Sequence, residues 1–136
     1  MILLDTNIIS ESLRPRGDPA VLAWLDAQAI ETLYLSTITL AELRFGIAAM
    51  PAGRRRTTLG RELDDRVLPL FDGRILPFDR AAADAYGALR ARARSEGQAI
   101  GTADGYIAGV AAAHGLAVAT RDVGPFEAAR LRVITP

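Results

Sequence analysis

Four acidic residues occupy positions where a parallel α/β fold would bring side chains together. Asp5 directly follows the apolar run Met1–Leu4, and Asp122 closely follows the apolar run Leu116–Thr120. Both runs are apolar enough to be buried strands of a parallel sheet. In an open parallel sheet, ligands bind in the crevice at the carboxyl ends of the strands. We therefore expect both carboxylates to point into that crevice.

The other two acids, Glu42 and Asp104, are predicted to lie on helices. The buried stripe of the first of these helices is expected to consist of Leu40, Leu43, Ile47 and Met50. Glu42 lies off that stripe, on the face shared with Thr39 and Phe45. Asp104 falls in the first turn of a helix that we expect Thr102 to cap, where the helix dipole stabilises a carboxylate. Taken alone, Asp104 would need no other explanation.

The combination of the four acids is what indicates chemistry. Carboxylates that converge repel one another and raise one another's pKa unless a divalent cation neutralises them. Oxygen ligands suit Mg²⁺ or Mn²⁺, whereas zinc favours nitrogen or sulfur, and this chain has one histidine and no cysteine. Carboxylate-bound Mg²⁺ supports hydrolysis of phosphodiesters, with either one ion or two ions about 4 Å apart.

Composition narrows the classes of function further. The chain has 136 residues, half of them hydrophobic, which predicts a single domain over residues 1–136. It contains no lysine, so P-loop and Schiff-base chemistry are excluded. The formal net charge is zero, so any polyanion must be bound by a local group of arginines.

The sequence also predicts a cytoplasmic location. No apolar run approaches the roughly 18 residues of a membrane span, and the chain opens into strand-like sequence without a basic leader. The absence of cysteine fits a reducing compartment. We therefore expect no membrane partner.

Strand-like and helix-like segments alternate along the chain. Thr6 and Asn7 are expected to cap a helix reaching Leu13, and a later helix is expected to turn Leu63, Val67 and Leu70 inward. This alternation predicts a three-layer α/β/α sandwich with a central, mostly parallel sheet. The expected strands cover 1–4, 33–35, 74–76, 116–120 and 131–134, and the other expected helices begin near 18, 37, 79 and 102.

Four short motifs, in order, resemble those of PIN-domain ribonucleases, especially the VapC/FitB-like toxins of bacterial type II toxin–antitoxin systems. The resemblance extends from residue 1 to the final strand. The motifs are Asp5-Thr6-Asn7, Ala41-Glu42-Leu43, Ala103-Asp104-Gly105-Tyr106-Ile107-Ala108 and Ala119-Thr120-Arg121-Asp122.

The resemblance implies an Mg²⁺-dependent endoribonuclease, with Mn²⁺ able to substitute. Asp5 and Asp104 would be the principal metal ligands, and Glu42 and Asp122 would complete the acidic pocket. It also implies a homodimer and a cognate antitoxin that inserts a basic side chain into the pocket. Promoter DNA would be bound indirectly, through the DNA-binding domain of the antitoxin. The choice of RNA over DNA as substrate rests on the resemblance alone.

The fourth acid departs from the pattern of many relatives. These place Asn where this chain has Asp122 and an acid where it has Pro125. We assign Asp122 as the substitute, as in the FitB-like subgroup, with Glu127 as the alternative. Thr120 is a candidate for holding a water or a carboxylate in place.

Two other functions compete with the nuclease. A receiver-like phosphoacceptor domain also gathers acids around Mg²⁺, but the missing lysine and the position of Asp5 on the first strand argue against it. The second alternative is a PIN-fold binding module that acts mainly in an antitoxin and promoter DNA complex, with little cleavage. The presence of all four acids favours retained chemistry.

Overall fold

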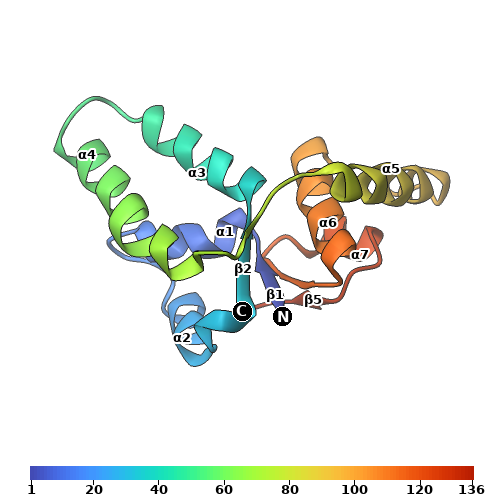
Figure 1. Ribbon diagram of the computed structural model, residues 1–136, viewed down its shortest axis with the longest axis horizontal. Helices are drawn as coiled ribbons and strands as arrows, with labels where there is room; N and C mark the ends of the chain where they lie inside the picture. The colour runs from blue at the N-terminus through green and yellow to red at the C-terminus, as the bar shows by residue number, and fades with distance from the viewer.

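A computed structural model describes residues 1–136 and shows a five-stranded parallel sheet in the order β3-β2-β1-β4-β5. The predicted α/β/α sandwich is confirmed (Figure 1). The strands are β1 (Ile2–Leu4), β2 (Leu33–Ser36), β3 (Ile75–Leu76), β4 (Ala117–Ala119) and β5 (Val133–Ile134).

Strand β1 occupies the centre of the sheet and pairs on both sides. Leu3 is in register with Tyr34 of β2 and with Val118 of β4. The chain builds the sheet outward in one direction through β2 and β3, and then in the other through β4 and β5. The reversal lies between β1 and β4, and such a switch point forms the ligand crevice of an open parallel sheet.

Helices cover both faces of the sheet. In Figure 1, α1 to α4 lie on one side of the strands and α5 to α7 on the other. None of these helices combines the length and the apolar character that crossing a membrane requires. The helices are α1 (Thr6–Ile9), α2 (Pro19–Ala27), α3 (Thr37–Ala48), α4 (Arg54–Arg61), α5 (Arg80–Ser95), α6 (Thr102–His114) and α7 (Val123–Ala128), with 3₁₀ turns at Ser10–Leu13, Ile30–Thr32 and Leu68–Phe71.

The core consists of two clusters, one on each face of the sheet. Side chains of β1 alternate between them: Leu3 packs with α5, α6 and α7, whereas Ile2 and Leu4 pack with the helices of the opposite face. This alternation follows from the period of two of a β-strand. Since β1 is buried on both faces, its residues are all apolar, and the first polar residue after it, Asp5, marks the end of the strand.

The structure corrects the prediction for the helix that follows Pro51. Leu63 and Val67 are buried as expected, but Leu70 is 53% exposed and Phe71 is buried in its place. Residues Glu62–Val67 form a π-helical segment, whose i→i+5 bonding widens the turn. The wider turn rotates the following residues, so that the inward position passes to Phe71.

Two further predictions differ from the structure, and one helix was not predicted. Asp5, not Thr6 or Asn7, caps α1, and its side chain accepts from the Thr6 N–H. Gly101 is the residue before α6, so Thr102 is its first residue instead of its cap. Helix α7 was not predicted, because its six residues include a glycine and a proline, which are poor helix formers.

Helices α5 and α6 approach closely because α6 presents glycines to Tyr86. A Cβ added at Gly109 would lie 2.7 Å from the Ala82 carbonyl oxygen and 3.1 Å from the Tyr86 Cβ. At Gly105, directly after Asp104, an added Cβ would lie 2.8 Å from a Tyr86 ring carbon. The position of the helix that carries Asp104 therefore depends on these two glycines.

We expect Gly109→Ala to lower the free energy of unfolding by about 1 to 3 kcal/mol, because the added methyl group meets backbone as well as a side chain. The matched control is Gly87→Ala on α5, where an added Cβ meets nothing within 4 Å. The control is expected to raise stability by up to about 1 kcal/mol through helix propensity alone. Urea unfolding of both variants measures the difference, and equal stability of the two variants would contradict the packing argument.

Candidate active site

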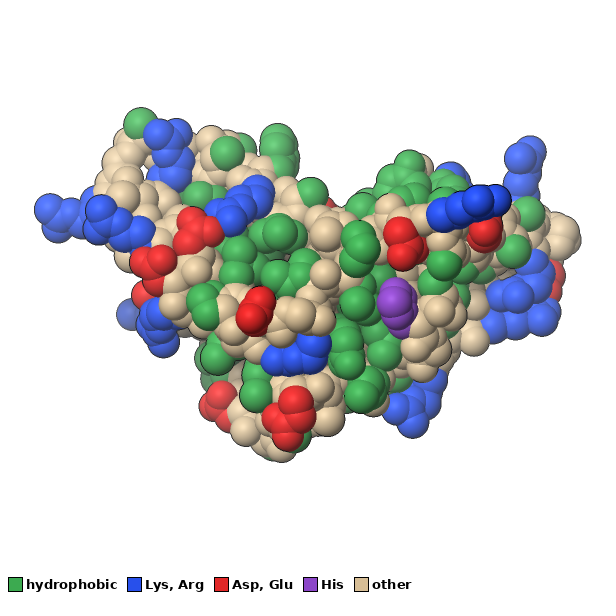
Figure 2. Space-filling model, in the orientation of Figure 1, with side chains coloured by type: hydrophobic (Ala, Val, Ile, Leu, Met, Phe, Trp, Pro, Cys, Tyr) green, Lys and Arg blue, Asp and Glu red, His purple; other side chains and the backbone are tan.

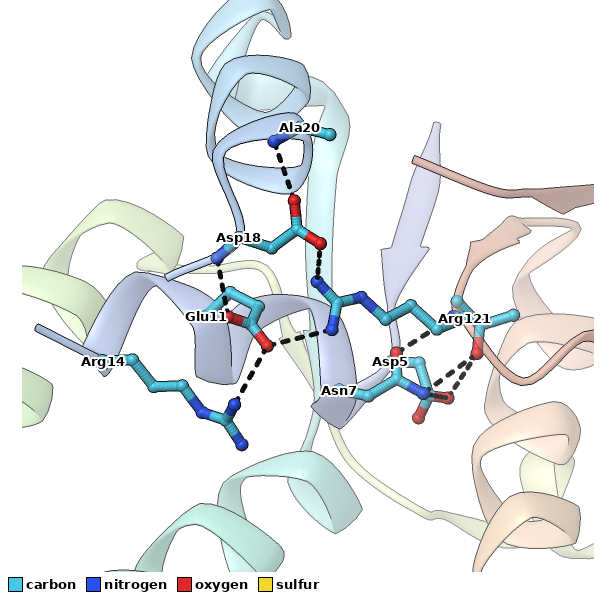
Figure 3. Close-up of polar contacts among 8 residues, drawn as sticks. Asp5, Asn7, Glu11, Arg14, Asp18, Ala20 and Arg121 are labelled. Atoms are coloured by element: carbon cyan, nitrogen blue, oxygen red, sulfur yellow. Dashed lines mark hydrogen bonds and ion pairs between the residues drawn. The ribbon is translucent and has the colours of Figure 1, made fainter. Parts of the chain in front are cut away.

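Asp5 is the centre of a hydrogen-bonded group at the carboxyl ends of β1 and β4. It is 4% exposed, and its Oδ1 accepts from the backbone N–H of Thr6 at 2.8 Å. Its Oδ2 accepts from the hydroxyl of Thr120 at 2.7 Å and from Nδ2 of Asn7 at 3.3 Å. Figure 3 shows the carboxylate beside Asn7 and the start of the loop after β4. Every one of these partners is uncharged.

Thr120 joins Asp5 to Asp122. Its hydroxyl donates to Asp5 and accepts from the backbone N–H of Asp122 at 2.9 Å. Thr120 is completely buried, whereas the Asp122 side chain is exposed and follows the end of β4 by three residues. The prediction that Thr120 holds a carboxylate in place is confirmed by this contact.

Glu42 reaches the same region from α3. Its Oε1 lies 2.9 Å from the hydroxyl of Thr6, which also lies 3.0 Å from the hydroxyl of the buried Thr39. A threonine hydroxyl has one proton to donate, so Thr6 donates to Glu42 and accepts from Thr39. Glu42 itself is exposed, so Thr6 orients a carboxylate that solvent can also reach.

The acids influence one another electrostatically. Burial raises the pKa of Asp5, the carboxylates of Glu42 and Asp122 raise it further, and hydrogen bonds from Thr120 and Thr6 oppose the rise. The pKa of Asp104 is also raised, by burial first and then by the carboxylates of Asp5 and Asp122. The structure therefore places all four predicted site residues in one electrostatic neighbourhood.

The surroundings of Asp104 favour its membership of the acidic group over helix electrostatics alone. A helix dipole acting alone would stabilise the carboxylate and lower its pKa. The pKa shifts in the opposite direction, because burial and neighbouring negative charge dominate. None of the four acids takes part in a salt bridge with an arginine. Their mutual repulsion is thus left uncompensated by the protein.

These residues fit a magnesium-type ion in donor chemistry. The donors are all oxygens, and the shared negative charge is what a divalent cation would neutralise. No three aspartate, glutamate or histidine side chains stand in a ready-made metal-ligand arrangement. Mg²⁺ does not need one, since it commonly keeps several waters and binds through one or two carboxylates. The fit rests on charge and donor type.

Glu127, the alternative fourth acid, and His114, the single histidine, are both exposed. Glu127 is exposed on α7, and it is not among the groups that shift the pKa of Asp5 or Asp104. His114 is exposed at the carboxyl end of α6. Asp122, by contrast, raises the pKa of both acids. The electrostatics therefore favour Asp122 over Glu127 as the fourth acid.

Sequence reasoning missed a second polar group beside the acids. Glu11 is only 3% exposed, and it pairs with Arg121 at 3.1 Å. The side chain of Arg121 is 37% exposed, so only the glutamate of this pair is removed from water. Glu11 lies between Ser10 and Ser12 in a predicted helix, so its sequence neighbours do not indicate its burial. Arg121 was noticed only as part of a motif.

Comparisons with known proteins agree with one another. A family model described as the PIN domain matches residues 2–131. The chain is 61% identical to VapC ribonuclease Y4jK of Sinorhizobium fredii, over all of this chain and 97% of that protein. It is 52% identical to Toxin FitB of Neisseria gonorrhoeae, over all of this chain and 98% of that protein.

Solved structures show the same likeness. The crystal structure of FitAcB from Neisseria gonorrhoeae has a TM-score of 0.96 and 51% identity, covering 100% of this chain and 98% of that chain. A structure of FitAB bound to an IR36 DNA fragment has a TM-score of 0.95 and 49% identity, covering 98% of this chain and 94% of that one.

We expect Asp104→Asn to leave the metal-free protein as stable as the wild type, or more stable, at neutral pH. A raised pKa means that the folded protein holds the proton more tightly than the unfolded chain does. The ionised carboxylate therefore destabilises the fold as the pH rises through the raised pKa. The advantage of the variant should disappear below pH 3.8, the ordinary pKa of the group.

Thermal unfolding of the metal-free protein at neutral pH and below pH 3.8 tests this expectation. Asp84→Asn is the matched control, because Asp84 is exposed on α5 and is not among the groups that shift the two raised pKa values. A melting temperature several degrees below that of the wild type at neutral pH, in Asp104→Asn alone, would show that Asp104 supports the fold.

Proposed function

Because this chain belongs to the PIN-domain family, we propose that it is a metal-dependent endoribonuclease and the toxin of a toxin–antitoxin pair. The observation that carries the proposal is the group of four mutually repelling carboxylates without an arginine partner, at the switch point of the sheet. The identity to a VapC ribonuclease and to Toxin FitB supports RNA hydrolysis and the toxin role.

Each acid has a proposed role at the metal. Asp5 and Asp104 would be the principal ligands of Mg²⁺ or Mn²⁺, and Glu42 and Asp122 would complete the pocket. The ion would supply an activated water and offset negative charge on the phosphate and the leaving oxygen. The rest of the chain orients the ligands: Thr120 and Asn7 hold Asp5, and Thr6 holds Glu42.

A hollow lined by α5 and by the segment between α5 and α6 would bind the RNA backbone. It has a volume of about 730 Å³, and its lining includes Tyr86, Arg90 and Arg94. Tyr86 packs against Gly105, the residue after Asp104, and its hydroxyl accepts a hydrogen bond from Arg90. Neither arginine is in a salt bridge, so the charge of each is available to a phosphate, and Tyr86 orients that of Arg90. On the face shown in Figure 2, basic and acidic side chains are interspersed, and no continuous basic patch covers it.

The proposed partners are an antitoxin and, through it, promoter DNA. FitAB, to which this chain is similar, has been solved bound to DNA. Because none of the four acids pairs with an arginine of this chain, the acidic pocket is complementary to a basic side chain of an antitoxin. We also propose a homodimer, and one exposed apolar side chain favours it: Phe45 on α3 is 75% exposed. Exposed aromatic residues of this size are enriched at protein interfaces.

The first test is cleavage of a mixed pool of single-stranded and structured RNA by the purified chain. We expect cutting with Mn²⁺ or Mg²⁺, none with EDTA, and a loss of at least about 100-fold in Asp5→Asn, because a principal ligand is removed. The variant excludes a contaminating ribonuclease. Cutting that continues in EDTA, or in the folded variant, would contradict the proposal. A folded, antitoxin-free chain that cuts nothing would favour the binding-module alternative.

We expect Arg90→Gln/Arg94→Gln to raise the KM for RNA roughly tenfold, equivalent to about 1.4 kcal/mol, because two phosphate contacts are lost. The kcat should change little, since neither side chain belongs to the acidic group. The slope of log KM against log salt should fall by about 0.7 per lost contact. The control is Arg54→Gln/Arg55→Gln, two exposed arginines at the start of α4. Equal effects of the two double variants would contradict the assignment of the hollow.

A further inference from the structure

We propose that Glu11 and Arg121 form a positioning device for the acidic pocket, which holds Asn7 and the loop of Asp122 in place around Asp5. Arg121 lies between Thr120 and Asp122 in the sequence, yet its side chain points away from the acids (Figure 3). The proposal rests on the proposed function only for its effect on metal binding, since the positioning itself is a property of the metal-free protein.

The guanidinium group of Arg121 is held by two carboxylates from another part of the chain. Its Nη1 donates to Glu11 Oε1 at 3.1 Å, and its Nη2 donates to Asp18 Oδ2 at 2.7 Å. Arginine's planar fork fixes orientation as well as position when its donors are bound in this way. The side chain of Arg121 thereby anchors the loop after β4 to the segment between α1 and α2.

The two carboxylates are themselves fixed. Glu11 is buried in the 3₁₀ turn after α1, and its Oε2 accepts from the backbone N–H of Asp18 at 2.9 Å. Asp18 caps α2 by accepting from the N–H of Ala20 at 2.8 Å. Arg14 approaches Glu11 at 3.5 Å from the solvent side. Arg121 is therefore bound to a frame that is tied to two helices.

The backbone of Arg121 acts on the other side of the loop. Its N–H donates to Asn7 Oδ1 at 3.2 Å. With its oxygen turned to Arg121, the amide of Asn7 must turn its NH₂ group the other way. That NH₂ group lies 3.3 Å from Asp5 Oδ2 and 3.3 Å from the hydroxyl of Thr120. The orientation of Asn7, and with it one hydrogen bond to Asp5, thus depends on where Arg121 is held.

Thr120 is the last residue before the loop whose backbone N–H bonds to the sheet, at the Ile134 carbonyl. The N–H groups of Arg121 and Asp122 both bind side chains, Asn7 Oδ1 and Thr120 Oγ1, and neither continues the sheet. A partly buried ion pair is by itself weak evidence for stability, because apolar residues can often replace such a pair without loss. Apolar residues cannot replace the directional hydrogen bonds of Arg121 to Glu11 and Asp18, which fix the loop. This difference separates a positioning role from a merely structural one.

The test compares variants that remove the hydrogen bonds of the Arg121 side chain with a control variant that removes an ion pair elsewhere in the chain. Glu11→Leu/Arg121→Met removes both charges of the pair together, and Arg121→Lys keeps the charge but removes the fork. The control is Glu62→Leu/Arg66→Met, which removes an ion pair of 3.0 Å whose arginine side chain is 75% exposed. For each protein, NMR measures backbone hydrogen exchange without metal, and calorimetry measures Mn²⁺ affinity.

In the double variant and in Arg121→Lys, we expect faster hydrogen exchange of the backbone N–H groups of residues 121 and 122. Exchange at Leu3 and Val118 in the sheet should stay unchanged. Mn²⁺ affinity should fall roughly tenfold or more, as is typical when a group that orients metal ligands is lost. The kcat should fall while the KM for RNA stays constant. The control should match the wild type in every measurement.

Two results would overturn the inference. One is wild-type exchange at Arg121 and Asp122 in Arg121→Lys and in the double variant. The other is equal acceleration at Leu3 and Val118 in both variants, which would make the pair general support for the fold. A wild type that neither binds Mn²⁺ nor cuts RNA would refute the proposed function instead, and the exchange rates would still decide whether the pair positions the loop.

Discussion

Repulsion between carboxylates is the constraint on which the rest of this structure depends. Asp5 and Asp104 have raised pKa values because each is partly removed from water and faces other acids. Left free, such groups would move apart or bind protons. They stay together because β1, the most enclosed strand, carries one of them, and because α6, held against α5 by two glycines, carries another.

The polar residues around the acids divide into two groups with different effects. Thr6, Asn7 and Thr120 touch the carboxylates without bringing positive charge, so they orient the acids and leave them able to attract a cation. Arg121, which carries positive charge and directly precedes Asp122 in the sequence, is bound instead by Glu11 and Asp18. The guanidinium group of Arg121 is thus held by carboxylates outside the group of four acids.

Much of this arrangement was predictable from local sequence. Apolar runs ending in Asp5 and near Asp122 predicted the strands, the sheet and the side of the sheet where the acids lie. The burial of Glu11 was not predictable, because it depends on Arg121, which is 110 residues away in the sequence. Phe71 is buried where Leu70 was predicted to be, because one helical turn is wide, and no residue pattern there predicts that turn.

The position of β4 beside β1 has a consequence for how the protein is made. Asp5 and Thr120 are hydrogen bonded across 115 residues, and the Asp5 N–H is bonded to Ala119. Contacts of such long range form only after most of the chain is available. A ribosome that has released the first hundred residues would therefore present Asp5, Glu42 and α3 without the loop that completes the pocket. The acids of a newly made chain are assembled only when nearly all of it has been synthesised.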